Sequence, residues 1–197
     1  MPNWCCTFYA LVGDKPRVEA AYNALNRVAH TPRSPKYGSD SFLPDSRWLG
    51  YVVTDVLGTE YEKLDCRGTF GELELKEEGG RRSICFTTMT AWAPCTSLWV
   101  CFASRFNLSL NYQADEPGSE VYEKCNPDGI YPENYIYDSE EDGSVYFDTL
   151  AEFMKEYGLA MGLAPGTPYE EVARFVEQNT GNRLYRYEGC DDPECCA

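Results

Sequence analysis

The sequence is short of residues and segments on which several protein classes depend. It contains a single histidine, His30, among 197 residues, although histidine is the usual general base near neutral pH. No basic leader precedes its first apolar run, so we expect no signal peptide. No stretch approaches the roughly 18 apolar residues of a membrane span. These absences predict a soluble, cytoplasmic protein with no membrane partner.

Basic residues are also few, with 17 Lys and Arg against 32 Asp and Glu and a formal net charge of −15. Nucleic acids and anionic membranes attract basic surfaces. The charge balance therefore argues against direct nucleic-acid binding and predicts a partner protein with a basic surface. Glycine-rich stretches lack the strand-loop-helix context and the Lys-Ser/Thr ending of a phosphate-binding loop, which disfavours a nucleotide enzyme.

The ten cysteines include no C-x-x-C pair. In a reducing compartment free thiols behave as small apolar residues, so we expect no disulfides. Cys5 and Cys6 are neighbours on an expected strand and should point to opposite faces, which prevents them from holding one ion. Cys190, Cys195 and Cys196 lie beside acids but lack the paired spacing of structural zinc sites. We expect no metal and no cofactor.

Hydrophobic periodicity and turn residues predict alternating strands and helices. Residues 48–57 are ambiguous: Tyr51-Val52-Val53 favours a strand, whereas the spacing of Trp48 and Val56 favours a helix. We predict a helix here. The expected elements are a strand over 3–12, a helix over 15–30 capped by Asp14, an irregular connection over 31–47, a helix over 48–57, a hairpin from Phe70 that turns at Gly79-Gly80, a helix from Pro94 to Phe106, strands within 107–116 and 120–129, a strand with an acidic turn over 133–147, two helices between 148 and 181, the second capped by Thr167 with Pro168 at its first position, and a strand over 183–187 that returns to the main body.

This order predicts an α+β fold: a ferredoxin-like (split β-α-β) antiparallel sheet with two covering helices, elaborated by an insertion and a C-terminal helical segment. We expect a ferredoxin-like domain over 1–147 with an insertion at about 31–66. A helical extension with the last strand follows over 148–189, and a tail over 190–197.

Several segments together resemble a known family. They are "MPNWC", the apolar strand that ends at Gly13-Asp14, "TAWAPCTSLWVCFASRFNLSLNYQADEPG" with Trp92, Pro94, Leu98 and Tyr112, and "YEKCNPDG". They are similar to the YubB-type ferredoxin-like domain over about residues 1–140. The segment Trp48–Leu57 departs from the stronger tryptophan-glycine signature of family members. Since such proteins are carried by plasmids, phages and other mobile elements, the resemblance implies this fold and a mobile-element setting, with no established chemistry.

Acidic residues give the clearest indication of function. Residues two apart on a strand face lie about 6.6 Å from each other, close to two base-pair rises of about 3.4 Å. A row of acids at this spacing could imitate a nucleic-acid backbone and occupy a basic groove, although acids also simply keep proteins soluble. The candidate partner-binding residues are Glu72, Glu74, Glu77, Glu78, Asp138, Glu140, Glu141 and Asp142, with Asp115, Glu116, Glu120 and Glu123 as a possible extension.

The sequence therefore predicts a non-enzymatic interaction protein of a mobile element. It would bind a host protein through an acidic surface, as a nucleic-acid mimic or an inhibitor of a defence complex. No catalytic residue is assigned. Two alternatives stay open: a small enzyme or ligand-binding domain that uses the open sheet face or the loop with Tyr37 and Trp48, and a structural component that self-associates through an edge strand.

Overall fold

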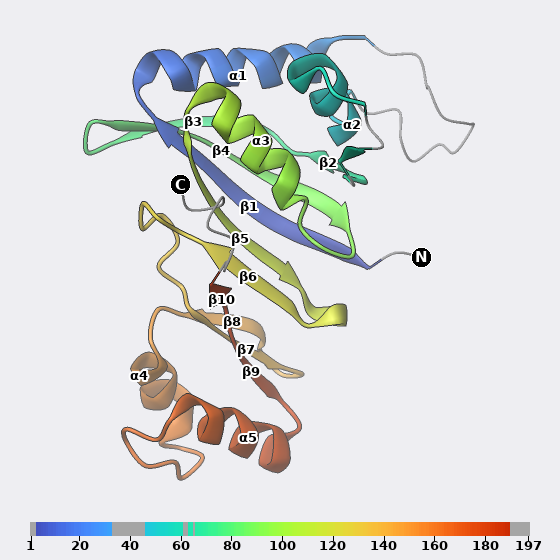
Figure 1. Ribbon diagram of the computed structural model, residues 1–197. Coiled ribbons are helices and arrows are strands. Elements are labelled where there is room, and N and C mark those ends of the chain that lie inside the picture. Colours follow the sequence, from blue (N-terminus) through green and yellow to red (C-terminus); the bar gives the residue numbers. More distant parts are fainter. Residues whose placement is uncertain (1–2, 33–45, 61–62, 65, 190–197) are drawn as a thin grey trace. The chain divides into compact units, whose positions relative to one another are not determined.

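The computed structural model describes residues 3–32, 46–60, 63–64 and 66–189. The protein is α+β, as predicted, and its chain divides into two compact units (Figure 1). Unit 1 is built from the chain up to Ile130 and from Gly189 onward, and unit 2 is built from residues 131–188. Within the described residues, no helix is long and apolar enough to cross a membrane.

A seven-stranded sheet forms the centre of unit 1. Its strands lie in the order β10-β6-β5-β1-β4-β2, and β3 also pairs with β4. β1 lies between β4 and β5 and is antiparallel to both, which confirms the predicted first strand. The strands of this sheet are β1 (Trp4–Gly13), β2 (Gly68–Phe70), β3 (Glu74–Glu78), β4 (Arg81–Ala91), β5 (Ser109–Glu116), β6 (Val121–Cys125) and β10 (Glu188–Gly189).

Helices α1 (Lys15–His30) and α3 (Thr96–Phe106) cover one face of this sheet (Figure 1). α1 begins at the predicted cap, where the Asp14 carboxylate accepts a hydrogen bond from the backbone N–H of Arg17 at 3.1 Å. α2 (Leu49–Tyr51) continues as a π-helix over Val52–Leu57, so the helical interpretation of 48–57 is confirmed. Most of the predicted 31–47 connection lies outside the described residues.

Aromatic side chains form the middle of the unit 1 core. Tyr9 on β1, Phe86 on β4 and Trp99 on α3 lie with their ring centroids 4.6–5.4 Å apart. All three are buried, and burying an apolar side chain such as Phe86 contributes roughly 1.5–3 kcal/mol. A one-residue slip of β1 would turn Tyr9 to the other face, so this packing fixes the register of the central strand.

The predicted hairpin is present between β3 and β4, and both turn glycines have positive φ, 57° at Gly79 and 81° at Gly80. Two adjacent residues with positive φ are what a two-residue type I′ hairpin turn requires. The strand predicted from Phe70 is instead divided into β2 and β3, which both pair with β4. At Gly71, between them, a Cβ would lie 2.7 Å from the Thr87 hydroxyl oxygen, so a glycine allows this close approach.

Unit 2 has a smaller antiparallel sheet in the order β8-β7-β9, with two helical segments on one face. The core contains three aromatic residues, Tyr137, Phe147 and Phe153. Its elements are β7 (Tyr135–Ser139), β8 (Gly143–Phe147), α4 (Leu150–Phe153), a π-helix that continues α4 over Met154–Gly158, α5 (Tyr169–Thr180) and β9 (Arg183–Arg186).

The end of the last helix of unit 2 lies where it was predicted, and its beginning is capped by a different residue. Thr149 and Glu152 form a capping box at the start of α4. α5 ends at Gly181, as predicted, with φ of 74°. Thr167, the predicted cap of α5, instead donates its hydroxyl to the Ala164 carbonyl at 2.7 Å, and Pro168 occupies the cap position.

The division of the chain differs from the expected boundary at 147/148. Residues 131–147 belong with the helices that follow them, because β7 pairs with β8 and β9 and because Tyr137 and Phe147 pack on Phe153. The strand expected to return to the main body, β9, pairs with β7 instead. Unit 2 is therefore an α+β unit of its own that includes the last predicted strand.

Candidate functional site

The first group of predicted acids lies on and just before β3. Side chains alternate along a strand, so Glu74 and Glu77 lie on opposite faces. Lys76 shares the face of Glu74 and pairs with it, with Nζ 3.3 Å from Oε2. Glu78 stands in register with Arg81 across the hairpin, and Glu72 is exposed before the strand begins. Basic residues therefore interrupt the negative charge along β3.

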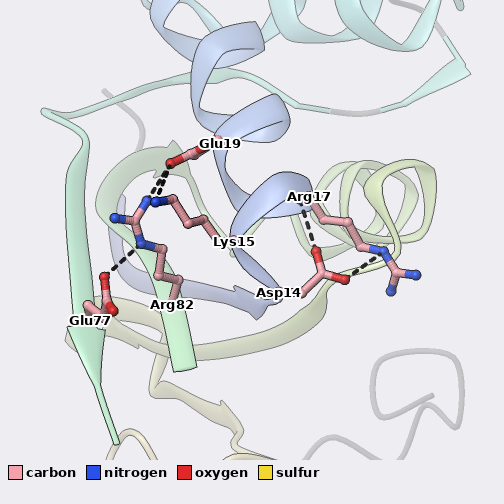
Figure 2. Close-up of polar contacts among 6 residues, drawn as sticks. All are labelled: Asp14, Lys15, Arg17, Glu19, Glu77 and Arg82. Carbon is pink, nitrogen blue, oxygen red and sulfur yellow. Dashed lines mark hydrogen bonds and ion pairs between the residues drawn. The ribbon is translucent and has the colours of Figure 1, made fainter. Parts of the chain in front are cut away.

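Glu77 has a structural contact of its own, shown in Figure 2. The Arg82 guanidinium donates from Nε to Glu77 at 2.9 Å and from Nη1 to Glu19 of α1 at 2.6 Å. The hydrogen bond to Glu77 raises the pKa of Arg82 above its ordinary value, so the guanidinium keeps its charge. Through Arg82, Glu77 of β3 is therefore linked by hydrogen bonds to β4 and α1. The Arg82 guanidinium partly balances the negative charge of Glu77.

The second group of predicted acids lies in unit 2, at the turn between β7 and β8. Glu140, Glu141 and Asp142 are adjacent and exposed. The Asp142 carboxylate accepts a hydrogen bond from the Tyr157 hydroxyl at 3.2 Å. Asp138 accepts one from the Ser144 hydroxyl at 3.1 Å. This turn brings four of the predicted residues together, separately from the β3 group in unit 1.

The two units differ in charge. Residues 131–188 contain twelve Asp and Glu against four Lys and Arg, a formal net charge of −8, whereas residues 1–130 contain seventeen acids against thirteen bases, a net charge of −4. Unit 2 thus carries about half of the net charge of the chain on fewer than a third of its residues. Excess charge of one sign produces a field that acts beyond single contacts.

The acids proposed as an extension do not share a surface. Glu116 is 3% exposed, and its carboxylate accepts from the Gly118 backbone N–H at 3.0 Å, which makes it part of a turn. Asp115 lies on the sheet face opposite the helices, whereas Glu123, in register with core residue Ala114, lies on the helix side. Glu120 has positive φ of 55° in the turn before β6.

The sheet face opposite α1 and α3 exposes apolar side chains that were not assigned from the sequence. Trp4 is 45% exposed, Phe8 42% and Met89 42%. Trp4 and Phe8 alternate with core residues of β1, and Met89 is in register with Cys6 on that strand. The alternation around buried Tyr9 is a signal from which Phe8 could have been placed on the opposite face.

The loop after β6 is fixed beside this face. Asn111 donates to the Asp128 carboxylate at 2.8 Å and accepts from the Asp128 backbone N–H at 3.0 Å. Asp128 also accepts from the Arg81 guanidinium at 2.8 Å. Ala10 and Asn111, neighbours in register, are fully buried on this side of the sheet. One end of the face is thus closed, and the exposed residues lie toward the other end.

The cysteines that the structure describes do not gather into a metal site. Cys5 and Cys6 lie on opposite faces of β1, as predicted. Burial raises the pKa of the Cys5 thiol to about 11, and burial followed by the nearby Asp115 charge raises the pKa of Cys6. Both thiols therefore lack the lowered pKa of reactive cysteines. Among the described residues, no group of three or more His, Cys, Asp or Glu could hold a metal ion.

His30 and the last cysteines complete the list of candidates from the sequence. His30 is in the last turn of α1, and its Nδ1 donates to the Asn26 carbonyl at 2.8 Å, a local helix contact. Cys190, Cys195 and Cys196 lie outside the described residues, as does Tyr37.

Comparisons with protein-family models, with curated proteins and with solved structures find no match.

Proposed function

We propose that this chain is a non-enzymatic interaction protein that binds a basic surface of a host protein, chiefly through unit 2. The observation that carries the proposal is the net charge of −8 on residues 131–188. A field of one sign speeds the approach of an oppositely charged surface and disfavours partners of the same sign. The exposed turn with Glu140, Glu141 and Asp142 is the leading contact site.

The acids of β3 are the weaker part of the surface. Glu74 pairs with Lys76, and Glu77 pairs with Arg82. A partner would have to compete with these bases for the carboxylates. We therefore assign the electrostatic contribution mainly to the β7–β8 turn, and keep β3 as a comparison surface.

The proposal includes a mobile-element setting in which the host protein is a basic, nucleic-acid-binding effector of a defence complex. The resemblance of unit 1 to the YubB-type domain motivates it. The strand order β5-β1-β4-β3, with α1 and α3 on one face, supports a ferredoxin-like fold for that unit. Acidic imitation of a nucleic acid is the specific version of the proposal.

The test is an affinity capture from host lysate at about 50 mM and about 500 mM salt. The Debye length is much shorter at the higher concentration, so contacts between exposed charges are then largely screened. The bait is the whole chain, and the main variant carries Glu140→Lys and Glu141→Lys. The matched control carries the same number of reversals on the other surface, Glu72→Lys and Glu74→Lys. We expect a basic protein that is retained at low salt, released at high salt and lost with the first variant alone. Equal capture by both variants, or no salt-sensitive protein, would refute the proposal.

A second candidate is a ligand-binding domain that uses the open sheet face of unit 1. The exposed Trp4, Phe8 and Met89 favour it. The same capture tests this candidate with Phe8→Ser and Met89→Ser. A partner or small molecule that is lost from this variant, and kept by both charge-reversed variants at high salt, would assign binding to the sheet face.

A further inference from the structure

Unit 2 contains an apolar pocket of about 400 Å³ beside α4. α4 contributes Leu150 and Ala151, and the π-helix that continues it contributes Met154 and Lys155. The segment between this π-helix and α5 contributes Leu159 and residues 165–167. This volume is near the lower end of ligand pockets, which span roughly 300–1,000 Å³. It is large enough to receive an apolar side chain.

The segment that follows the π-helix and lines the pocket is apolar, although unit 2 as a whole is strongly acidic. Residues 158–168, "GLAMGLAPGTP", contain no charged residue. Leu159 is 50% exposed, and Pro165 is exposed as well. Gly158 allows the π-helix to hold Met154 closely, because a Cβ there would lie 2.5 Å from the Met154 sulfur. Exposed apolar residues gathered around a pocket favour a site of interaction over chance exposure.

Acidic residues flank the pocket in sequence on both sides. Glu152 and Glu156 are exposed on the helical segment that supplies four of its lining residues, and Glu170 and Glu171 are exposed just after its last lining residue, Thr167. Lys155 is the only charged residue in the lining. An apolar pocket in a unit with a net charge of −8 is complementary to an apolar side chain that has basic residues on either side of it.

We infer that this pocket receives an apolar anchor, a leucine-like side chain on a basic amphipathic segment of the partner protein. The inference rests on the proposed function and specifies how the acidic unit recognises its partner. Lys155 contributes its aliphatic stem to the pocket while its ammonium opposes the bases of the segment. An anionic ligand, such as a fatty acid, would require the opposite: it would depend on Lys155 and be repelled by the net negative charge of the unit.

The experiment measures the binding of labelled probe peptides to the full chain by fluorescence anisotropy. The first probe is a peptide of about 15 residues with leucines at i, i+3, i+4 and i+7 and Lys or Arg elsewhere. The second has Glu in place of every base, and decanoate is a third, competing probe. We expect the basic peptide to bind, and the acidic peptide and decanoate to fail to bind.

Two variants decide the chemistry. Leu159→Ser removes an apolar side chain from the pocket without adding charge and should weaken binding of the basic peptide about tenfold or more, the loss of one apolar contact. Lys155→Glu should strengthen it about threefold, because it removes the only repulsive charge of the lining. The matched control is Leu75→Ser on β3 of unit 1, where the leucine is 40% exposed and its replacement should have no effect.

Several outcomes would overturn the inference. The inference is wrong if neither unit 2 variant changes the affinity of the basic peptide. It is also wrong if decanoate binds and Lys155→Glu abolishes that binding. If the Leu159→Ser chain still captures the host protein while the Glu140 and Glu141 reversals prevent capture, the pocket is refuted and the proposed function stays intact. Peptide binding as expected, without any salt-sensitive host protein, would support the pocket and refute the proposed function.

Discussion

Replacing Phe153 with alanine tests whether unit 2 is stabilised by a core of its own. Phe153 is fully buried, and its ring centroid lies 5.4 Å from that of Tyr137, 5.7 Å from Phe147 and 5.8 Å from Tyr157. These residues pack in one hydrophobic cluster, which shares no member with the buried cluster of unit 1. The cavity should therefore weaken unit 2 and spare unit 1.

The expected loss is large for a unit of this size. Phe→Ala substitutions in cores cost about 3–5 kcal/mol in the free energy of unfolding, and aromatic pairs contribute about 0.5–1.5 kcal/mol beyond burial. With three ring neighbours, we expect about 4–5 kcal/mol. At roughly 0.05–0.15 kcal/mol per residue, a unit of this length has a total stability of about 3–9 kcal/mol. Phe153→Ala should bring unit 2 close to its unfolding midpoint, and Phe153→Leu should cost less than about 1.5 kcal/mol.

The tryptophans make the two units separable in the assay. All four, at positions 4, 48, 92 and 99, lie outside residues 131–188. In a urea titration, tryptophan fluorescence reports unit 1, and hydrogen exchange of the β7 and α5 amides reports unit 2. We expect the variant to lose protection in unit 2 at an unchanged fluorescence midpoint. A fluorescence midpoint that falls in parallel would show that the units unfold together and refute the reasoning.

Single contacts elsewhere give three more expectations. In a chain with serine at positions 190, 195 and 196, iodoacetamide at pH 8 should modify exposed Cys101 first and spare Cys5, because burial raises the Cys5 pKa to about 11; prompt labelling of Cys5, read by peptide mass spectrometry, would contradict this. Thr149→Ala removes the hydroxyl that caps α4 and should destabilise unit 2 by about 1 kcal/mol in the exchange assay, and an equal loss in Thr149→Ser would show that the hydroxyl is not the cause. Burial, followed by the hydrogen bond to Asp142, raises the Tyr157 pKa above its ordinary value of 10.0. The neutral phenol is thus favoured on folding, so its contribution is present below pH 10 and is lost as pH rises through the raised pKa; an ultraviolet titration in which Tyr157→Phe removes no late-ionising phenol would rule this out.

Local signals in the sequence were sufficient for most elements of unit 1. The apolar run that ends at Gly13-Asp14 specifies β1, and Asp14 with the 3.6-residue repeat specifies α1. Gly79-Gly80 specifies the hairpin turn, because glycine adopts positive φ without strain. These features depend on residues that are close in sequence, so periodicity and turn chemistry can reveal them.

Partners far apart in sequence could not be predicted in the same way. β9 pairs with β7 across more than forty residues, and no local pattern distinguishes this pairing from a return to the first sheet. The break between β2 and β3 depends on the approach of Thr87 to Gly71. Each requires knowledge of which segments lie side by side, so the sequence pattern does not reveal that residues 135–138 pair with residues 183–186.

The candidate site was predictable in its charge and not in its contacts. Counting acids led to the exposed residues of the β7–β8 turn. It could not reveal that Arg82 of the next strand and Glu19 of α1 share a network with Glu77. The pocket was also missed, since its lining comes from a helix and a later segment whose residues match no motif.

Charge and pocket would act at different stages of binding by unit 2. The net charge of −8 on residues 131–188 acts at a distance, so it should govern the association rate and its dependence on salt. The pocket acts only at contact, so Leu159 should govern the dissociation rate. Reversal of Glu140 and Glu141 should therefore slow association, and Leu159→Ser should shorten the lifetime of the complex. Carboxylates that merely kept the chain dissolved would produce no such separation, because their reversal would then leave the association rate unchanged.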